Sequence, residues 1–200
     1  LYRQAHRALL EFAETQPLSQ PLIRLANRLD LVASHYTDLP ETKTKFDATL
    51  VAALKRFVYG EDRLAVLQAS YAYSMKTDES RLSSLLDELE KAVGIKPERL
   101  PADHPRTFME ELLYRVEFAH TRGDMARVES LLSDILALEP ESATAMERLG
   151  SLRYLSGRFA EAIASWDAAL KIETRDYELQ SLREYLRQAQ QRVAGKSTLP

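Results

Sequence analysis

Residues 109–140 read MEELLYRVEFAHTRGDMARVESLLSDILALEP, and residues 141–172 read ESATAMERLGSLRYLSGRFAEAIASWDAALKI. When Gly157 is placed on Gly123, the second segment aligns with the first, in these further pairs: Phe159 on Met125, Ala162 on Val128, Trp166 on Leu132, Ala169 on Ile135 and Ile172 on Leu138. We call the spacing from Gly123 to Gly157 the repeat period. A period of about 34 residues is typical of chains built from one helical hairpin per repeat. We therefore predict two antiparallel helical hairpins over residues 109–172.

A short glycine turn separates the two predicted helices of each hairpin. Gly123 and Gly157 interrupt the apolar period where the chain must reverse, and glycine readily takes the left-handed conformation that often ends a helix. Asp124 is then placed to cap the following helix. In the second hairpin, small residues are expected where two helices cross closely and large ones beside them: Gly150, Ala162 and Ala169, with Phe159 and Trp166.

The second hairpin resembles a tetratricopeptide repeat (TPR). The residues that match the family pattern are Met146, Leu149, Gly150, Tyr154, Gly157, Phe159, Ala162, Trp166, Ala169 and Leu170. The first hairpin is a weaker copy, since it has Arg115-Val116 where the family has Leu-Gly, and Val128 where the family has alanine. The resemblance implies an all-α fold in which antiparallel hairpins stack as a right-handed superhelix.

The first half of the chain has helical periodicity without an echo at the repeat period. We expect helices over residues 2–15, 22–36, 41–59 and 62–75, and a fifth that is capped by Thr77-Asp78 and ends at Val93. On the first helix, Ala5, Ala8, Leu9 and Phe12 share one face. The two helices joined at Gly60 are either a degenerate repeat or part of a small helical bundle.

Four regions are expected along the chain. Residues 1–94 form a helical N-terminal region, and residues 95–106 form a connector because their three prolines exclude a regular helix. Residues 107–194 hold the two TPR-like hairpins and a C-terminal capping helix, of the kind that repeat arrays need. That helix should turn Leu179, Leu182, Leu186 and Ala189 inward. Residues 195–200 are expected to be a disordered tail.

Composition excludes several classes of protein. The net charge is −3 with a pI of about 5.9, whereas a nucleic-acid-binding surface would need a basic stripe. No apolar run approaches the ~18 residues of a membrane span, so we expect no direct membrane insertion. Without cysteine there is no disulfide, thiolate metal site or cysteine nucleophile. The start at Leu1 suggests a soluble fragment of a larger protein, and the sequence leaves both a cytoplasmic and a periplasmic location open.

No motif in the sequence predicts catalysis. The four histidines lack the three- or four-residue spacing that puts two metal ligands on one helix face. Glu117 and His120 share a face and are interpreted as a solvated pair. A phosphate loop, a nucleophile elbow and a zincin motif are all missing from the sequence. We therefore expect no catalytic residues, no metal site, no cofactor and no enzyme activity.

The resemblance also implies a concave groove lined by the first helix of each hairpin. The residues on that side are Glu110, Leu113, Glu117, His120, Thr144, Glu147, Ser151 and Tyr154. Glu117 and Glu147 lie centrally, so the groove should prefer a peptide or helix with basic and apolar side chains. The lysine, arginine and asparagine clamp of the chaperone-binding members of the family is missing here, so chaperone binding is not expected.

These observations favour a non-enzymatic protein–protein interaction module, acting as a scaffold, an assembly factor or an adaptor. Its partner would be another protein, bound through a peptide or a helix, and not a nucleic acid. The alternative is a regulatory or ligand-sensing helical domain of a larger bacterial protein. A homo-oligomer is compatible with either function.

Overall fold

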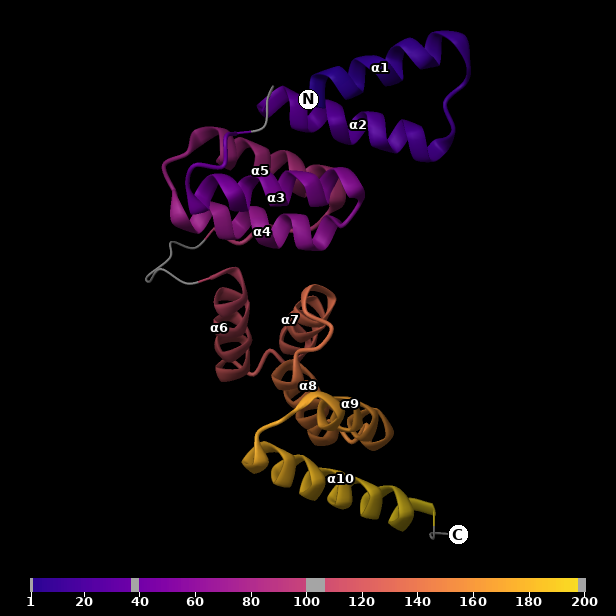
Figure 1. The fold of residues 1–200 in the computed structure, drawn as a ribbon, viewed down its shortest axis with the longest axis vertical. Helices are drawn as coiled ribbons and strands as arrows, with labels where there is room; N and C mark the ends of the chain where they lie inside the picture. The colour runs from indigo at the N-terminus through magenta and orange to yellow at the C-terminus, as the bar shows by residue number, and fades with distance from the viewer. Residues whose placement is uncertain (1, 37–39, 100–106, 198–200) are drawn as a thin grey trace. The chain divides into compact units, whose positions relative to one another are not determined.

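The computed structural model describes residues 2–36, 40–99 and 107–197. Within these residues the chain is all helical, which confirms the predicted all-α class (Figure 1). The helices are α1 (Tyr2–Thr15), α2 (Gln20–His35), α3 (Lys45–Tyr59), α4 (Asp62–Met75), α5 (Ser80–Val93), α6 (Phe108–Thr121), α7 (Met125–Leu138), α8 (Ala143–Leu155), α9 (Phe159–Ile172) and α10 (Asp176–Ser197). The chain divides into two compact units, Leu1–Phe108 and Met109–Pro200, which are described separately.

The first unit packs α1 to α5 around one apolar core. α1 pairs with α2, α3 pairs with α4, and α2 also contacts α3 and α5 (Figure 1). The large side chains buried deepest in this core come from α2, α3 and α5, and α4 contributes fully buried alanines: Val32, Leu50, Leu54, Leu82 and Leu85, with Ala65, Ala69 and Ala72.

Two helices of this unit begin later than the sequence predicts. α3 begins at Lys45 rather than Glu41, because Thr44 and Asp47 form a capping box. The Thr44 hydroxyl accepts from the Asp47 N–H at 3.1 Å, and the Asp47 carboxylate accepts from the Thr44 N–H at 2.9 Å. α5 begins at Ser80, so the predicted cap at residues 77 and 78 is wrong.

The packing face of α1 also differs from the prediction. Ala5, Ala8 and Phe12 are exposed, whereas Tyr2 is buried and Leu9 packs against the core of the first unit. α1 carries two overlapping apolar stripes, and the periodicity of one helix does not tell which stripe a neighbour covers.

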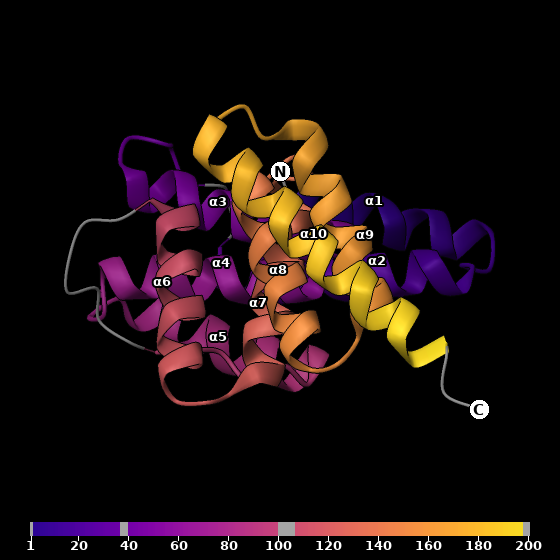
Figure 2. The ribbon, with the colours of Figure 1, turned by 90° about the horizontal axis from the view of Figure 1, so that it is seen from below.

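The second unit runs from α6 to α10. α8 pairs with α9, α9 pairs with α10, and α7 contacts α8 (Figure 1, Figure 2). On α10, Leu182, Leu186 and Ala189 are buried as predicted, and Leu179 is half-buried. This helix continues to Ser197, past its expected end at Ala194. The rest of the expected tail, residues 198–200, and residues 100–106 of the connector lie outside the described residues.

The repeat period of the sequence recurs in the backbone of the second unit. α9 begins and ends one repeat period after α7. Gly123 and Gly157 have φ angles of 73° and 74°, in the left-handed region. In both turns the glycine N–H donates at 2.9 Å to the carbonyl three residues earlier. The next N–H donates to the carbonyl five residues earlier, at 3.0 Å after Gly123 and 2.8 Å after Gly157.

The turn between α3 and α4 has the same construction. Gly60 has a φ of 87° and donates to the Phe57 carbonyl at 3.1 Å, and the Glu61 N–H donates to the Arg56 carbonyl at 2.9 Å. Three hairpins of the chain therefore reverse through one type of glycine turn, two in the second unit and one in the first.

Candidate functional site

The α8/α9 hairpin holds its two helices close together. Gly150 lies directly against Trp166, because a Cβ atom built on Gly150 would be 2.4 Å from Trp166 Nε1. The indole Nε1 donates to the Glu147 carbonyl at 3.0 Å, and Trp166 is only 2% exposed. Ala162 and Ala169 are fully buried. These contacts confirm the predicted close crossing and place Trp166 in the core.

The α6/α7 hairpin is more open. Over the described residues of these two helices, the backbones make no close pairing comparable with α8 and α9, and the ribbons lie apart in both views (Figure 1, Figure 2). The equivalents of Gly150 and Ala162 in this hairpin are Val116 and Val128, both buried. Because the side chains at a crossing set the distance between helix axes, we interpret these larger residues as the reason for the wider spacing of α6 and α7.

A hollow of about 230 Å³ lies among α6, α7 and α8. Its floor is apolar and includes Val116, Val128 and Leu152, all buried. Two apolar side chains at its rim face solvent, since Leu155 is 79% exposed and Met125 is 39% exposed. The hollow therefore offers an apolar pocket with an uncovered apolar rim.

Charged and polar groups surround this apolar floor. Glu117 on α6 forms an ion pair with Arg148 on α8 at 2.5 Å. Ser151 Oγ donates to Glu147 Oε1 at 3.1 Å. His120 completes the polar lining and is exposed. The two glutamates and the one arginine leave this lining with a net negative formal charge when the histidine is neutral.

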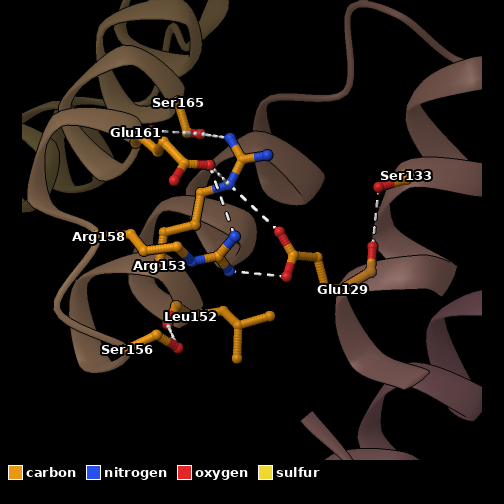
Figure 3. Close-up of polar contacts among 8 residues, drawn as sticks. All are labelled: Glu129, Ser133, Leu152, Arg153, Ser156, Arg158, Glu161 and Ser165. Carbon is orange, nitrogen blue, oxygen red and sulfur yellow. Dashed lines mark hydrogen bonds and ion pairs between the residues drawn. The ribbon is translucent and has the colours of Figure 1, made fainter. Parts of the chain in front are cut away.

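A second group of charged residues joins the two hairpins beside this hollow (Figure 3). Glu129 on α7 accepts from Arg158 Nη2 at 2.7 Å, and its other oxygen lies 3.5 Å from Arg153 Nε. Glu161 lies within 3.7 Å of Arg153 and within 3.5 Å of Arg158. The hydrogen bond from Arg158 lowers the pKa of Glu129 below its ordinary value. This network fixes α7 against α8 and the α8/α9 turn.

Four of the eight predicted groove residues line the hollow. They are Glu117, His120, Glu147 and Ser151. Glu117 pairs with Arg148, however, so it is not simply the solvated partner of His120 that the spacing suggests.

The other four predicted residues do not line the hollow. Glu110 and Thr144 are located near the starts of α6 and α8, and Leu113 is half-buried on α6. Tyr154 lies with the core side chains of the last hairpin, with its ring centroid 5.2 Å from that of Phe159 and 5.7 Å from that of Trp166.

Sequence reasoning missed Arg148 and Met125. Arg148 follows the predicted Glu147 directly, but its ion pair with Glu117 depends on how α6 and α8 approach each other. Met125 is the equivalent of Phe159 in the first hairpin, at a position that the repeat assigns to packing. It lines the hollow because α6 and α7 are separated. The hollow is therefore an apolar pocket whose rim carries charges of both signs.

The chain matches no protein-family model, no curated protein and no solved structure. In the part of the chain that the structure describes, no cluster of three or more potential ligand side chains could hold a metal ion. The described helices also include none with the length and apolar character needed to cross a membrane.

Proposed function

We propose that the second unit is a non-enzymatic protein-interaction module of the TPR type, which receives a peptide or helix of another protein in the hollow among α6, α7 and α8. The support for a stacked repeat is the repeat period, which is found in the helix bounds and in the turn hydrogen bonds as well as in the residues. α10 then covers the last hairpin through Leu182, Leu186 and Ala189, as a capping helix would.

The observation that carries the binding proposal is the exposed apolar rim over an apolar floor. An exposed apolar side chain such as Leu155 gains little from contact with its own fold, whereas a partner that covers it removes apolar surface from water. The hollow has room for one or two side chains. We infer that an apolar anchor of the partner contacts Val128 and Leu152 and is flanked by Leu155.

The polar rim selects the charge of the partner. Glu117 is already paired with Arg148, whereas Glu147 accepts from the neutral hydroxyl of Ser151. A carboxylate accepts several hydrogen bonds, so Glu147 retains capacity for a lysine or arginine of the partner. The preferred partner is therefore a segment that presents an apolar side chain beside a basic one.

The experiment compares capture by the full chain and by two matched variants. Leu155→Glu places a charge on the rim of the hollow. Tyr177→Glu makes the same kind of change on α10, where Tyr177 is 77% exposed and lies outside the hollow. We expect a partner that binds the unchanged chain and Tyr177→Glu to be lost with Leu155→Glu, and circular dichroism to show equal helix content in all three. Equal capture by both variants would show that the hollow is not the binding site.

A charge-specific arm tests the basic preference. Glu147→Lys should weaken binding of that same partner by about three- to tenfold, because rim charges are partly screened by solvent. The effect should decline as salt is added. An unchanged affinity would mean that Glu147 does not contact the partner. The apolar part of the proposal would still depend on the comparison of Leu155→Glu with Tyr177→Glu.

A further inference from the structure

The first unit contains a separate groove between α2 and α5. Two hollows, of about 460 Å³ and 350 Å³, lie along it. Asn27 and Leu31 line both hollows, so the two are neighbouring halves of one groove. One half is bordered by the C-terminal part of α2 and the N-terminal part of α5, and the other by the opposite ends of these two helices. The groove therefore follows two antiparallel helices.

The first half of the groove is polar and carries carboxylates from both helices. Asp30 comes from α2 and Glu88 from α5, with side chains 70% and 43% exposed. Each has a surface partner within the chain, His6 at 3.5 Å from Asp30 and Lys91 at 2.8 Å from Glu88. A cationic side chain in this half would be attracted from both walls of the groove.

The second half of the groove is largely apolar, with Leu31, Phe57 and Val93 in its lining. Arg28 also borders it, but its charge is neutralised by a bidentate ion pair with Asp62. The Arg28 guanidinium also lies over the Phe57 ring, 4.7 Å from its centroid. This half therefore suits an apolar side chain.

Arg24 gives the groove a direction. It lines the apolar half, and its guanidinium would repel a basic side chain placed there. Asp30 and Glu88 at the other end would attract that basic side chain. Complementary charges of this kind fix the register and orientation of a partner more than they add to its affinity.

The length of the groove fits a short helix. The lining residues of α2 run from Arg24 to His35, which spans roughly 16 Å at the rise of an α-helix. The centres of the two halves are then separated by about half of that span. Side chains seven positions apart on a helix share a face and lie about 10 Å apart, slightly more than this separation of roughly 8 Å.

We propose that the α2/α5 groove docks one helix of a partner protein, which places an apolar side chain near Phe57 and Val93 and a lysine or arginine between Asp30 and Glu88. The proposal is independent of the hollow in the second unit, since it depends on other residues of another unit. It assigns a second interaction surface to the chain.

The test uses two labelled alanine-based helical peptides and the full chain. One peptide carries leucine and lysine seven positions apart, and the other carries leucine and glutamate at the same positions. Fluorescence anisotropy measures their affinities for the unchanged chain, for Asp30→Lys with Glu88→Lys, and for Glu11→Lys with Glu14→Lys. The last variant changes the net charge equally on exposed positions of α1.

We expect the unchanged chain and the α1 variant to bind the leucine–lysine peptide about fivefold or more tightly than the leucine–glutamate peptide. Asp30→Lys with Glu88→Lys should reverse this preference. Ala92→Glu, at an exposed position of the apolar half, should weaken both peptides. The same preferences should be found when each of these chains also carries Leu155→Glu, which separates this groove from the hollow of the second unit.

Two results would overturn the proposal: no saturable binding of the leucine–lysine peptide to the unchanged chain, or the same preference after the charge reversal. If the double charge reversal lowers the helix content, Asp30→Asn with Glu88→Gln takes its place. These neutral substitutions should abolish the charge preference without reversing it, and a retained preference for lysine would again contradict the proposal.

Discussion

The hairpins α6/α7 and α8/α9 reverse through the same turn but space their helices differently. Both turns have a glycine near φ 73° and the same two backbone hydrogen bonds. α8 and α9 are nevertheless in close contact, whereas α6 and α7 are not comparably paired over their described residues. The turn therefore reverses the chain, and the distance between the helices is decided elsewhere.

Residue volume at the crossing accounts for the difference. The close hairpin has Gly150, Ala162 and Ala169 at positions where the open hairpin has Val116, Val128 and Ile135. The hairpin α3/α4 supports this interpretation independently. α3 and α4 are as closely paired as α8 and α9. At the same distances from its turn glycine, Gly60, this hairpin has three alanines: Ala53, Ala65 and Ala72.

Each of the two close hairpins also has a polar contact between its own two helices, outside the crossing. Four residues before the turn glycine each has an arginine, and eight residues after it each has a polar side chain. Arg56 Nε donates to Gln68 Oε1 at 2.8 Å, and Arg153 Nη1 lies 2.8 Å from Ser165 Oγ. The open hairpin has Ala119 in place of these arginines. Close backbones thus occur together with a polar bridge between the two helices.

The largest expected effect comes from removing the residue that fills the space beside Gly150. Trp166→Ala should lower the free energy of unfolding by about 3–5 kcal/mol, because it leaves a cavity and removes the hydrogen bond to the Glu147 carbonyl. Urea denaturation followed by circular dichroism measures this loss. A loss below about 1 kcal/mol would mean that the close hairpin does not depend on this contact.

The second prediction concerns substitutions that give the close hairpin the residues of the open one. Gly150→Val should destabilise the chain by about 1–3 kcal/mol, since its side chain would overlap the Trp166 indole. In Gly150→Val with Trp166→Leu, which copies Val116 and Leu132 of the open hairpin, the two losses should be less than additive by about 1 kcal/mol or more. Urea denaturation of the two single variants and the double variant, followed by circular dichroism, measures this coupling energy. Simple additivity would contradict the volume explanation.

The third prediction concerns the turns, where the two hairpins should behave alike. A Cβ at Gly123 or Gly157 would meet no atom within 4 Å, so Gly→Ala costs only the left-handed backbone conformation, about 1–2 kcal/mol at either site. The loss can be followed by Trp166 fluorescence, because the chain has one tryptophan and it lies in the second unit. Clearly unequal losses at the two glycines would show that the turns also differ in their contribution to packing.

Sequence periodicity predicts single helices of this chain better than it predicts their neighbours. On α10 one apolar stripe is opposed by a polar face, and the predicted Leu182, Leu186 and Ala189 are buried. α8 lies between α7 and α9, so apolar residues occur on more than one of its faces and its groove side is predicted only in part. The repeat pattern therefore predicts Tyr154 on the groove, whereas its ring packs with those of Phe159 and Trp166.

The hollow of the second unit could be predicted only in part for the same reason. Its predicted polar members share one face of α6 or α8, which the helical repeat gives directly. Its apolar floor depends on the wide spacing of α6 and α7, which is a consequence of packing between helices rather than of residue spacing along one helix. The ion pair between Glu117 and Arg148 likewise joins residues of two different helices that are far apart in the sequence. No local pattern encodes such a contact.

The smallest expected effect concerns the residue after each turn glycine, where the hairpins also differ. Asp124 caps α7, because its carboxylate accepts from the Arg127 N–H at 3.0 Å. Arg158 instead donates to Glu129 of the preceding hairpin at 2.7 Å. Glu129→Gln removes the charge of this second contact. At neutral pH it should cost about 0.5–1 kcal/mol, because the pair is partly exposed to solvent.

The pH dependence of that cost identifies the ion pair. The hydrogen bond from Arg158 lowers the pKa of Glu129 from its ordinary 4.5, so the folded state holds the proton more weakly than the unfolded chain does. The stabilisation is therefore complete above about pH 4.5 and disappears as the pH falls through the lower folded pKa. Glu129→Gln should lose its penalty over that range, whereas Glu141→Gln, at an exposed position, should show none at any pH. A penalty that persists in acid would mean that Glu129 joins the hairpins through packing rather than charge.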